Sequence, residues 1–67
     1  MTAREVTRRI RQHGGQLVRQ EGSHAMYRLD QCVATVPMHR GDIPAGMLRA
    51  IERDLAACVG ARRWLTR

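Results

Sequence analysis

The fold is decided by residues 16–37, which read QLVRQEGSHAMYRLDQCVATVP. Short apolar stretches alternate here with polar turn residues, and this pattern predicts three strands at 16–20, 24–29 and 32–36. Glu21-Gly22-Ser23 and Asp30-Gln31 are the expected turns between them. Pro37 has no backbone N–H to donate to a neighbouring strand, so it ends the third strand. Connections this short join antiparallel neighbours, so an antiparallel sheet is expected.

Alternation along the second and third strands assigns the two faces of the sheet. The apolar set that we expect on one face comprises Ala25, Tyr27, Leu29, Cys32, Ala34 and Val36. His24, Met26 and Arg28 lie on the other face. Because side chains alternate with a period of two, a single register fixes both faces. If the apolar set packs on helices, His24 and Arg28 point toward the open face of the sheet or its end.

Helical patterns flank the strands on both sides. Thr2 and Glu5 form a capping box, which predicts a helix at about 3–13 that Gly14-Gly15 ends. Asp42 or Ile43 is expected to cap a second helix, with Pro44 near its first turn and Gly60 at its end. The apolar stripe of that helix comprises Leu48, Ile51 and Leu55.

The order of these elements predicts an α+β fold, α-β-β-β-α, with two helices on one face of a three-stranded antiparallel sheet. We expect one domain over residues 1–67, because a chain of 67 residues holds only a marginal core. Residues 61–67 form a short basic tail, which Trp64 either pins to the helices or leaves loose.

The charge of the chain is strongly positive. All twelve basic residues are Arg, and the formal net charge is +6. Guanidinium groups bind phosphate through paired hydrogen bonds, so an anionic polymer is the favoured partner. The sequence has no apolar run long enough to span a bilayer and no apolar leader segment, so we expect a cytoplasmic protein without a membrane partner.

Cys32 and Cys58 lie in apolar surroundings. In a cytoplasmic protein the default expectation is two buried free thiols. The chain has no Cys-x-x-Cys motif and no clustered Cys/His set, so we expect neither a metal nor a cofactor.

Gly22-Ser23-His24 is the most informative tripeptide. Gly and Ser allow a tight turn, and His24 then begins a strand where solvent and substrate can reach it. An imidazole gives or takes a proton near neutral pH, since its ordinary pKa is about 6.5. The competing interpretation is a surface histidine beside a turn.

The motifs of the chain, taken in order, resemble those of the HicA toxins, small messenger-RNA interferases of toxin–antitoxin systems. The resemblance rests on Glu5-Val6, residues 17–24, residues 35–39 (TVPMH) and residues 46–51 (GMLRAI). The chain differs from the usual family pattern at Gln16, where the family usually has an aromatic residue, and at Met47, where the family often has Thr. The tail from Ala61 has no counterpart.

The resemblance implies a fold like a double-stranded-RNA-binding domain, cleavage of messenger RNA, and silencing by a HicB-type antitoxin. The family's catalytic histidine corresponds to His24, and His39 matches a recurrent histidine without an assigned role. We expect RNA contacts from Ser23, Arg19, Arg28, His39 and Arg40. Ser23 is expected to act as a turn residue and not as a nucleophile.

A lone histidine can cut RNA because the substrate supplies its own nucleophile, the 2′-hydroxyl. His24 would act as general acid or base, with guanidinium groups on the phosphate oxygens. His39 is either a second proton carrier or a loop histidine without chemistry.

The alternative function is a non-catalytic RNA-binding module. A DNA-binding regulator fits less well, because three strands separate the helices. The expected antitoxin is acidic and covers His24; its alternative is a partner that grips the second helix and the Trp64 tail.

Overall fold

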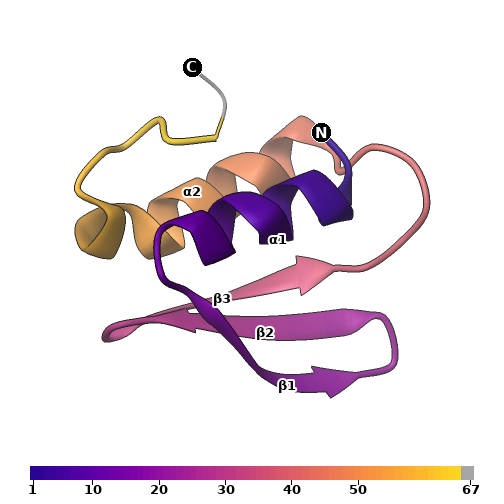
Figure 1. Ribbon diagram of the computed structural model, residues 1–67. Coiled ribbons are helices and arrows are strands. Elements are labelled where there is room, and N and C mark those ends of the chain that lie inside the picture. The colour runs from indigo at the N-terminus through magenta and orange to yellow at the C-terminus, as the bar shows by residue number, and fades with distance from the viewer. Residues whose placement is uncertain (66–67) are drawn as a thin grey trace.

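Two helices lie on one face of a three-stranded antiparallel sheet (Figure 1). The computed structural model describes residues 1–65. Its elements are α1 (Ala3–Gln12), β1 (Gln16–Glu21), β2 (His24–Leu29), β3 (Cys32–Pro37) and α2 (Ala45–Val59). The predicted fold class and element order are confirmed, and the strands begin at the predicted residues.

The start of α1 is closed by the predicted capping box. The backbone N–H of Glu5 donates to the Thr2 hydroxyl at 3.2 Å, and the backbone N–H of Thr2 donates to the Glu5 carboxylate at 2.8 Å. The helix ends before Gly14, whose φ of 97° favours glycine. A Cβ at the buried Gly15 would collide with the Ile10 side chain, so glycine lets β1 begin directly against α1.

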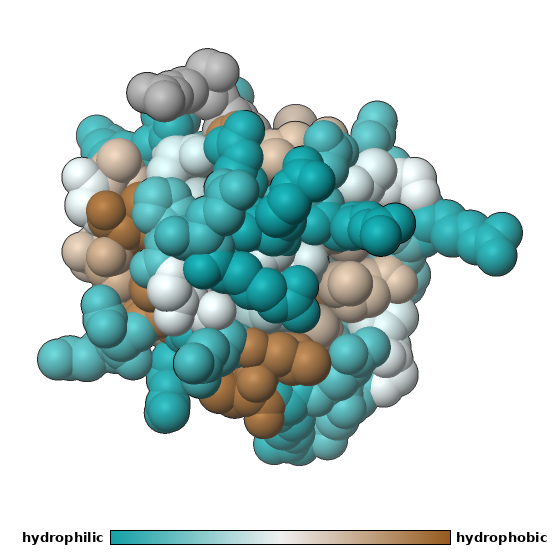
Figure 2. All heavy atoms as spheres, in the orientation of Figure 1, coloured by the Kyte–Doolittle hydropathy of each residue, from teal (hydrophilic) through white to brown (hydrophobic). Residues whose placement is uncertain are grey.

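The sheet has the order β1-β2-β3, and its inner face is the predicted one. Ala25, Tyr27 and Leu29 are buried on β2 beneath the helices. α2 packs mainly against β3, whereas β1 is exposed along its whole length. Leu17 and Val18 on β1 are 43% and 47% exposed, and apolar surface is visible at the level of β1 in Figure 2.

The predicted cap of α2 is wrong. Neither Asp42 nor Ile43 caps the helix; Pro44 is the N-cap residue, and its carbonyl accepts from the N–H groups of Met47 and Leu48. Ile43 lies before the helix and is held by other parts of the molecule. Its side chain is buried in the core, and its N–H donates to the Met1 carbonyl at 2.8 Å.

The tail is pinned to the helices, which decides the alternative that the sequence left open. Trp64 is 6% exposed, and its indole N–H donates to the Glu52 carbonyl at 3.0 Å. Arg9 on α1 donates to the Trp64 carbonyl at 3.1 Å, and the His13 ring meets the indole edge-on. The last two residues of the expected tail, Thr66 and Arg67, lie outside the described residues.

The expectation of two free thiols is also wrong. Cys32 and Cys58 form a disulfide between the start of β3 and the last turn of α2, with their Cα atoms 6.1 Å apart. Both residues are half-buried. The fold brings together two cysteines that are 26 positions apart in the chain, and their separation lies in the range that a disulfide spans. Among residues 1–65, no helix is long and apolar enough to cross a bilayer.

Candidate functional site

His24 is the first residue of β2 and lies at one end of the open face of the sheet. The register places it opposite Glu21 of β1 and Pro37 of β3. Its neighbour Ala25 is buried under the helices, so alternation turns the exposed His24 to the other face. The Gly22-Ser23 turn leads directly into it, as the sequence predicts.

His39 lies next to His24. The centroids of the two rings are 6.5 Å apart, and the rings meet edge to face at 81°. The loop that carries His39 is fastened at both ends: the N–H of Met38 donates to the Ser23 carbonyl, and the N–H of Ile43 donates to the Met1 carbonyl. The structure therefore brings together two imidazoles at the open end of the β2–β3 hairpin, one at the start of β2 and one just after β3.

A shallow hollow of about 300 Å³ opens beside His24 on the sheet. The side chains that line it come from all three strands: Arg19, Glu21, His24, Met26 and Thr35. Arg19 and Glu21 form an ion pair, and both side chains are mostly exposed, so the pair contributes little to stability. One guanidinium and one carboxylate thus share the hollow with His24.

Besides His39, three more of the predicted RNA-contacting residues lie near this hollow without lining it. Arg28 is on the same face of β2, further along the strand, where it pairs with Gln16 and Val33. Arg40 is exposed in the loop directly after His39. Ser23 is half-buried in the turn, and its carbonyl accepts a hydrogen bond from the Met38 N–H.

Three residues of the hollow, Glu21, Met26 and Thr35, are absent from the set of site residues predicted from the sequence. Thr35 lies opposite Met26, and Glu21 opposite His24. The signal that could have found them is the strand register, because residues paired across an antiparallel sheet project to the same face.

The hollow offers proton transfer and anion binding. The imidazole of His24 lines the hollow, that of His39 lies beside it outside the lining, and Arg19 supplies a fixed positive charge. Within residues 1–65 there is no group of three or more His, Cys, Asp or Glu side chains that could hold a metal ion.

The model of a protein family described as "HicA toxin of bacterial toxin-antitoxin" matches residues 3–56. The chain belongs to the HicA toxin family. It is therefore the toxin of a toxin–antitoxin system, whose partner is an antitoxin, and the resemblance seen in the sequence is confirmed. No curated protein and no solved structure matches the chain. The match in this HicA toxin includes His24 and His39 and ends within α2, before the pinned tail.

Proposed function

We propose that this toxin is an endoribonuclease that cleaves messenger RNA with His24, without a metal ion, and that a HicB-type antitoxin neutralises it. The observation that carries the proposal is the pair of exposed imidazoles, His24 on the sheet and His39 in the loop after β3, whose centroids are 6.5 Å apart. RNA cleavage through the 2′-hydroxyl needs one proton acceptor and one proton donor, and two adjacent histidines can supply both.

In the proposed reaction the 2′ oxygen of the substrate bonds to the neighbouring phosphorus, and the bond from phosphorus to the 5′ oxygen breaks. One imidazole takes the proton of the 2′-hydroxyl, and the other gives a proton to the leaving 5′ oxygen. We assign His24 to one of these two roles and His39 to the other. Each proton transfer of this kind contributes roughly 10²–10⁴-fold to a rate.

Arg19 is the residue that we propose for the phosphate oxygens at the cut, because it lines the same hollow as His24. A guanidinium held near the phosphorus stabilises the charge that develops there. Glu21 pairs with Arg19, and a phosphate would compete with this carboxylate for the guanidinium. Arg28 and Arg40 flank the site and are proposed to bind neighbouring phosphates, with Ser23 contacting the strand at the turn.

The proposed antitoxin acts by covering this surface. The hollow is open and its rim is basic, so an acidic partner placed on it would neutralise the arginines and block His24 together. Complementary charge also speeds the capture of a partner.

The first test is cleavage of labelled messenger RNA in the presence of EDTA by the wild-type protein and by His24→Ala and His39→Ala. We expect each variant to lose about 10²-fold or more in rate while its affinity for RNA stays close to that of the wild type. The matched control is His13→Ala, because His13 is the one histidine outside the proposed site and contacts Trp64 at the end of α1. Full cleavage by His24→Ala would disprove the assignment.

The second candidate function is the non-catalytic RNA-binding module. The exposed, basic sheet face favours it, because such a surface binds RNA without any proton transfer. A wild-type protein that binds RNA tightly but leaves it uncut in the same assay would establish this function instead.

A further inference from the structure

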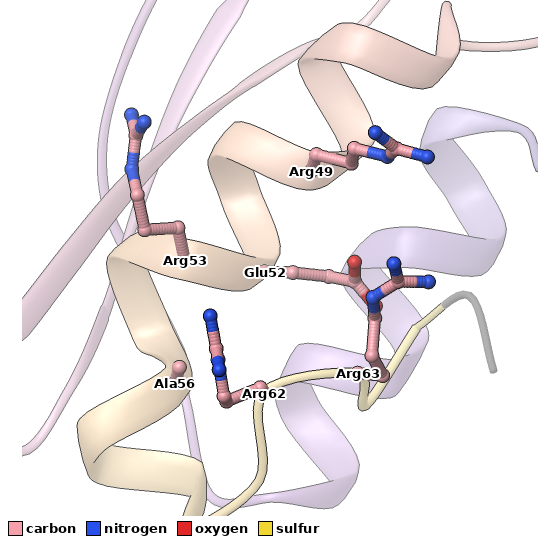
Figure 3. A pocket seen from close by; sticks show the side chains of 6 residues that line it. All are labelled: Arg49, Glu52, Arg53, Ala56, Arg62 and Arg63. Atoms are coloured by element: carbon pink, nitrogen blue, oxygen red, sulfur yellow. The ribbon is translucent and has the colours of Figure 1, made fainter.

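A second hollow, of about 440 Å³, lies between α2 and the segment that follows it (Figure 3). Four arginines line it together with one acidic and one small residue: Arg49, Glu52, Arg53, Ala56, Arg62 and Arg63. Arg49 and Arg53 project from α2, whereas Arg62 and Arg63 come from the tail (Figure 3). This basic hollow lies outside the His24 site and shares no residue with it.

The fold builds the basic hollow from two sequence features. Along α2 the core residues Leu48, Ile51 and Leu55 face the sheet, so Arg49 and Arg53 lie on a different side of the helix. Gly60 ends the helix in a left-handed conformation, and the chain turns back.

Contacts of the tail with Glu52 then hold the returning segment beside α2. The Trp64 indole donates to the Glu52 carbonyl, and the Leu65 N–H donates to the Glu52 carboxylate at 2.8 Å. The backbone that carries Arg62 and Arg63 is therefore fixed at both ends, by the end of α2 on one side and by the buried Trp64 and Leu65 on the other.

The charge of the basic hollow is incompletely balanced by the protein. Arg49, Arg62 and Arg63 form no ion pair with any other residue between 1 and 65, and Arg53 has only an exposed contact with Asp54 at 3.7 Å. Glu52 is 2% exposed, and its carboxylate accepts a hydrogen bond from the tail backbone. Four guanidinium groups around one hollow repel one another, so an anion bound there would relieve this repulsion.

We propose that the basic hollow binds phosphate groups of the RNA backbone and holds the strand at a distance from the cut. This inference rests on the proposed RNA substrate. Guanidinium groups bind phosphate through paired hydrogen bonds, and phosphate binding needs no apolar contact. A protein partner would instead need buried apolar or aromatic anchors, and Ala56 is the apolar residue in this lining.

Only part of the basic hollow lies beyond the region that the family model matches. The family match ends at residue 56, so Arg62 and Arg63 lie outside it. The hollow also lies on the far side of the core from His24, because His24 is on the open face of the sheet and α2 covers the other. A strand that occupies both sites must pass around the molecule, which lengthens the RNA that the toxin contacts.

The test measures binding of single-stranded oligouridine of about 16 nucleotides by Arg62→Gln/Arg63→Gln and by Arg49→Gln/Arg53→Gln. The control is Arg4→Gln/Arg8→Gln, which removes the same charge from exposed positions on α1. For each pair in the hollow we expect the slope of log affinity against log salt to fall by about 1.4, which corresponds to two phosphates. The control should change the slope by less than half of this.

Equal slope changes in all three double variants would overturn the proposal, and so would a tighter complex with polyglutamate than with oligouridine. The two hollow variants guard against a folding defect, since Arg49 and Arg53 sit on α2 and not on the pinned tail. The binding assay does not depend on cleavage. If the protein binds RNA through the basic hollow but does not cut it, the proposed catalysis is refuted and the proposed phosphate binding is not.

Discussion

The side chains of Thr2 and Glu5 together close the first turn of α1, because each accepts a hydrogen bond from the backbone N–H of the other residue. The hydrogen bond from the backbone N–H of Thr2 is the main cause that lowers the pKa of Glu5 below its ordinary value of 4.5. The Thr2 hydroxyl lowers this pKa further, and the nearby N-terminus and Arg8 add smaller effects in the same direction. Since these groups favour the charged carboxylate, the ionised form of Glu5 stabilises the folded state.

This lowered pKa predicts a pH-dependent stability. A carboxylate whose pKa is lower in the folded state stabilises the protein above the unfolded pKa and ceases to do so as pH falls through the folded value. We therefore expect the wild type to be more stable than Glu5→Gln at neutral pH. The difference should shrink below pH 4.5. Urea unfolding of both proteins from neutral pH to below pH 4.5 measures this difference in the free energy of unfolding. A difference that does not change with pH would contradict the role assigned to the ionised Glu5.

At the scale of elements, the disulfide and the tail tie together parts that the sheet alone does not join. Cys32–Cys58 links β3 to the last turn of α2, and the Trp64 tail spans α2 and α1. His24 lies at the opposite end of β2 from Leu29, which pairs with Cys32. The disulfide therefore supports the end of the sheet that is remote from the histidines.

The position of the disulfide predicts its effect on stability. A cross-link over 26 positions removes loop entropy from the unfolded chain that is worth about 3.5 kcal/mol. We expect a reductant to lower the free energy of unfolding of the wild type by this order, measured by urea unfolding. Cys32→Ala/Cys58→Ala should be about as unstable without reductant and should not respond to it. An unchanged wild type in reductant would refute a stabilising cross-link.

At the scale of the whole molecule, positive charge is distributed over both layers. The formal net charge is +6, and polar side chains cover much of the face seen in Figure 2. The His24 hollow lies on the open sheet and the basic hollow lies beside α2. An inhibitor can thus bind on the open face of the sheet or beside α2, but the two histidines, His24 and His39, lie only at the sheet.

This arrangement leads to a prediction for the antitoxin complex. If the partner covers His24 directly, amide hydrogen exchange should slow in β1, β2 and the His39 loop when the antitoxin is added. Association should also slow as salt is raised, because complementary charge speeds the encounter. Protection confined to residues after Pro44 would show that the antitoxin grips α2 and the tail, and would refute direct occlusion.

Much of the fold could be predicted because its signals are local. The capping box at Thr2, the alternation from His24 to Leu29 and the left-handed Gly60 each act over a few residues, and the structure has all three. The cap of α2 was missed because Ile43 is held by the Met1 carbonyl, a contact distant in sequence. The likeness to a double-stranded-RNA-binding domain and the extent of the domain over residues 1–67 stay predictions.

The element order, the two faces of the sheet and the exposure of His24 follow from local sequence patterns, because period-two alternation and helix caps depend on neighbouring residues. The contacts between distant segments depend on how the elements pack: His39 lies beside His24, Cys32 is bonded to Cys58, and the tail arginines lie beside α2. These contacts join residues that no periodicity relates. They form only when the apolar faces of the helices and the sheet pack together, since burial of that surface brings distant segments to one place.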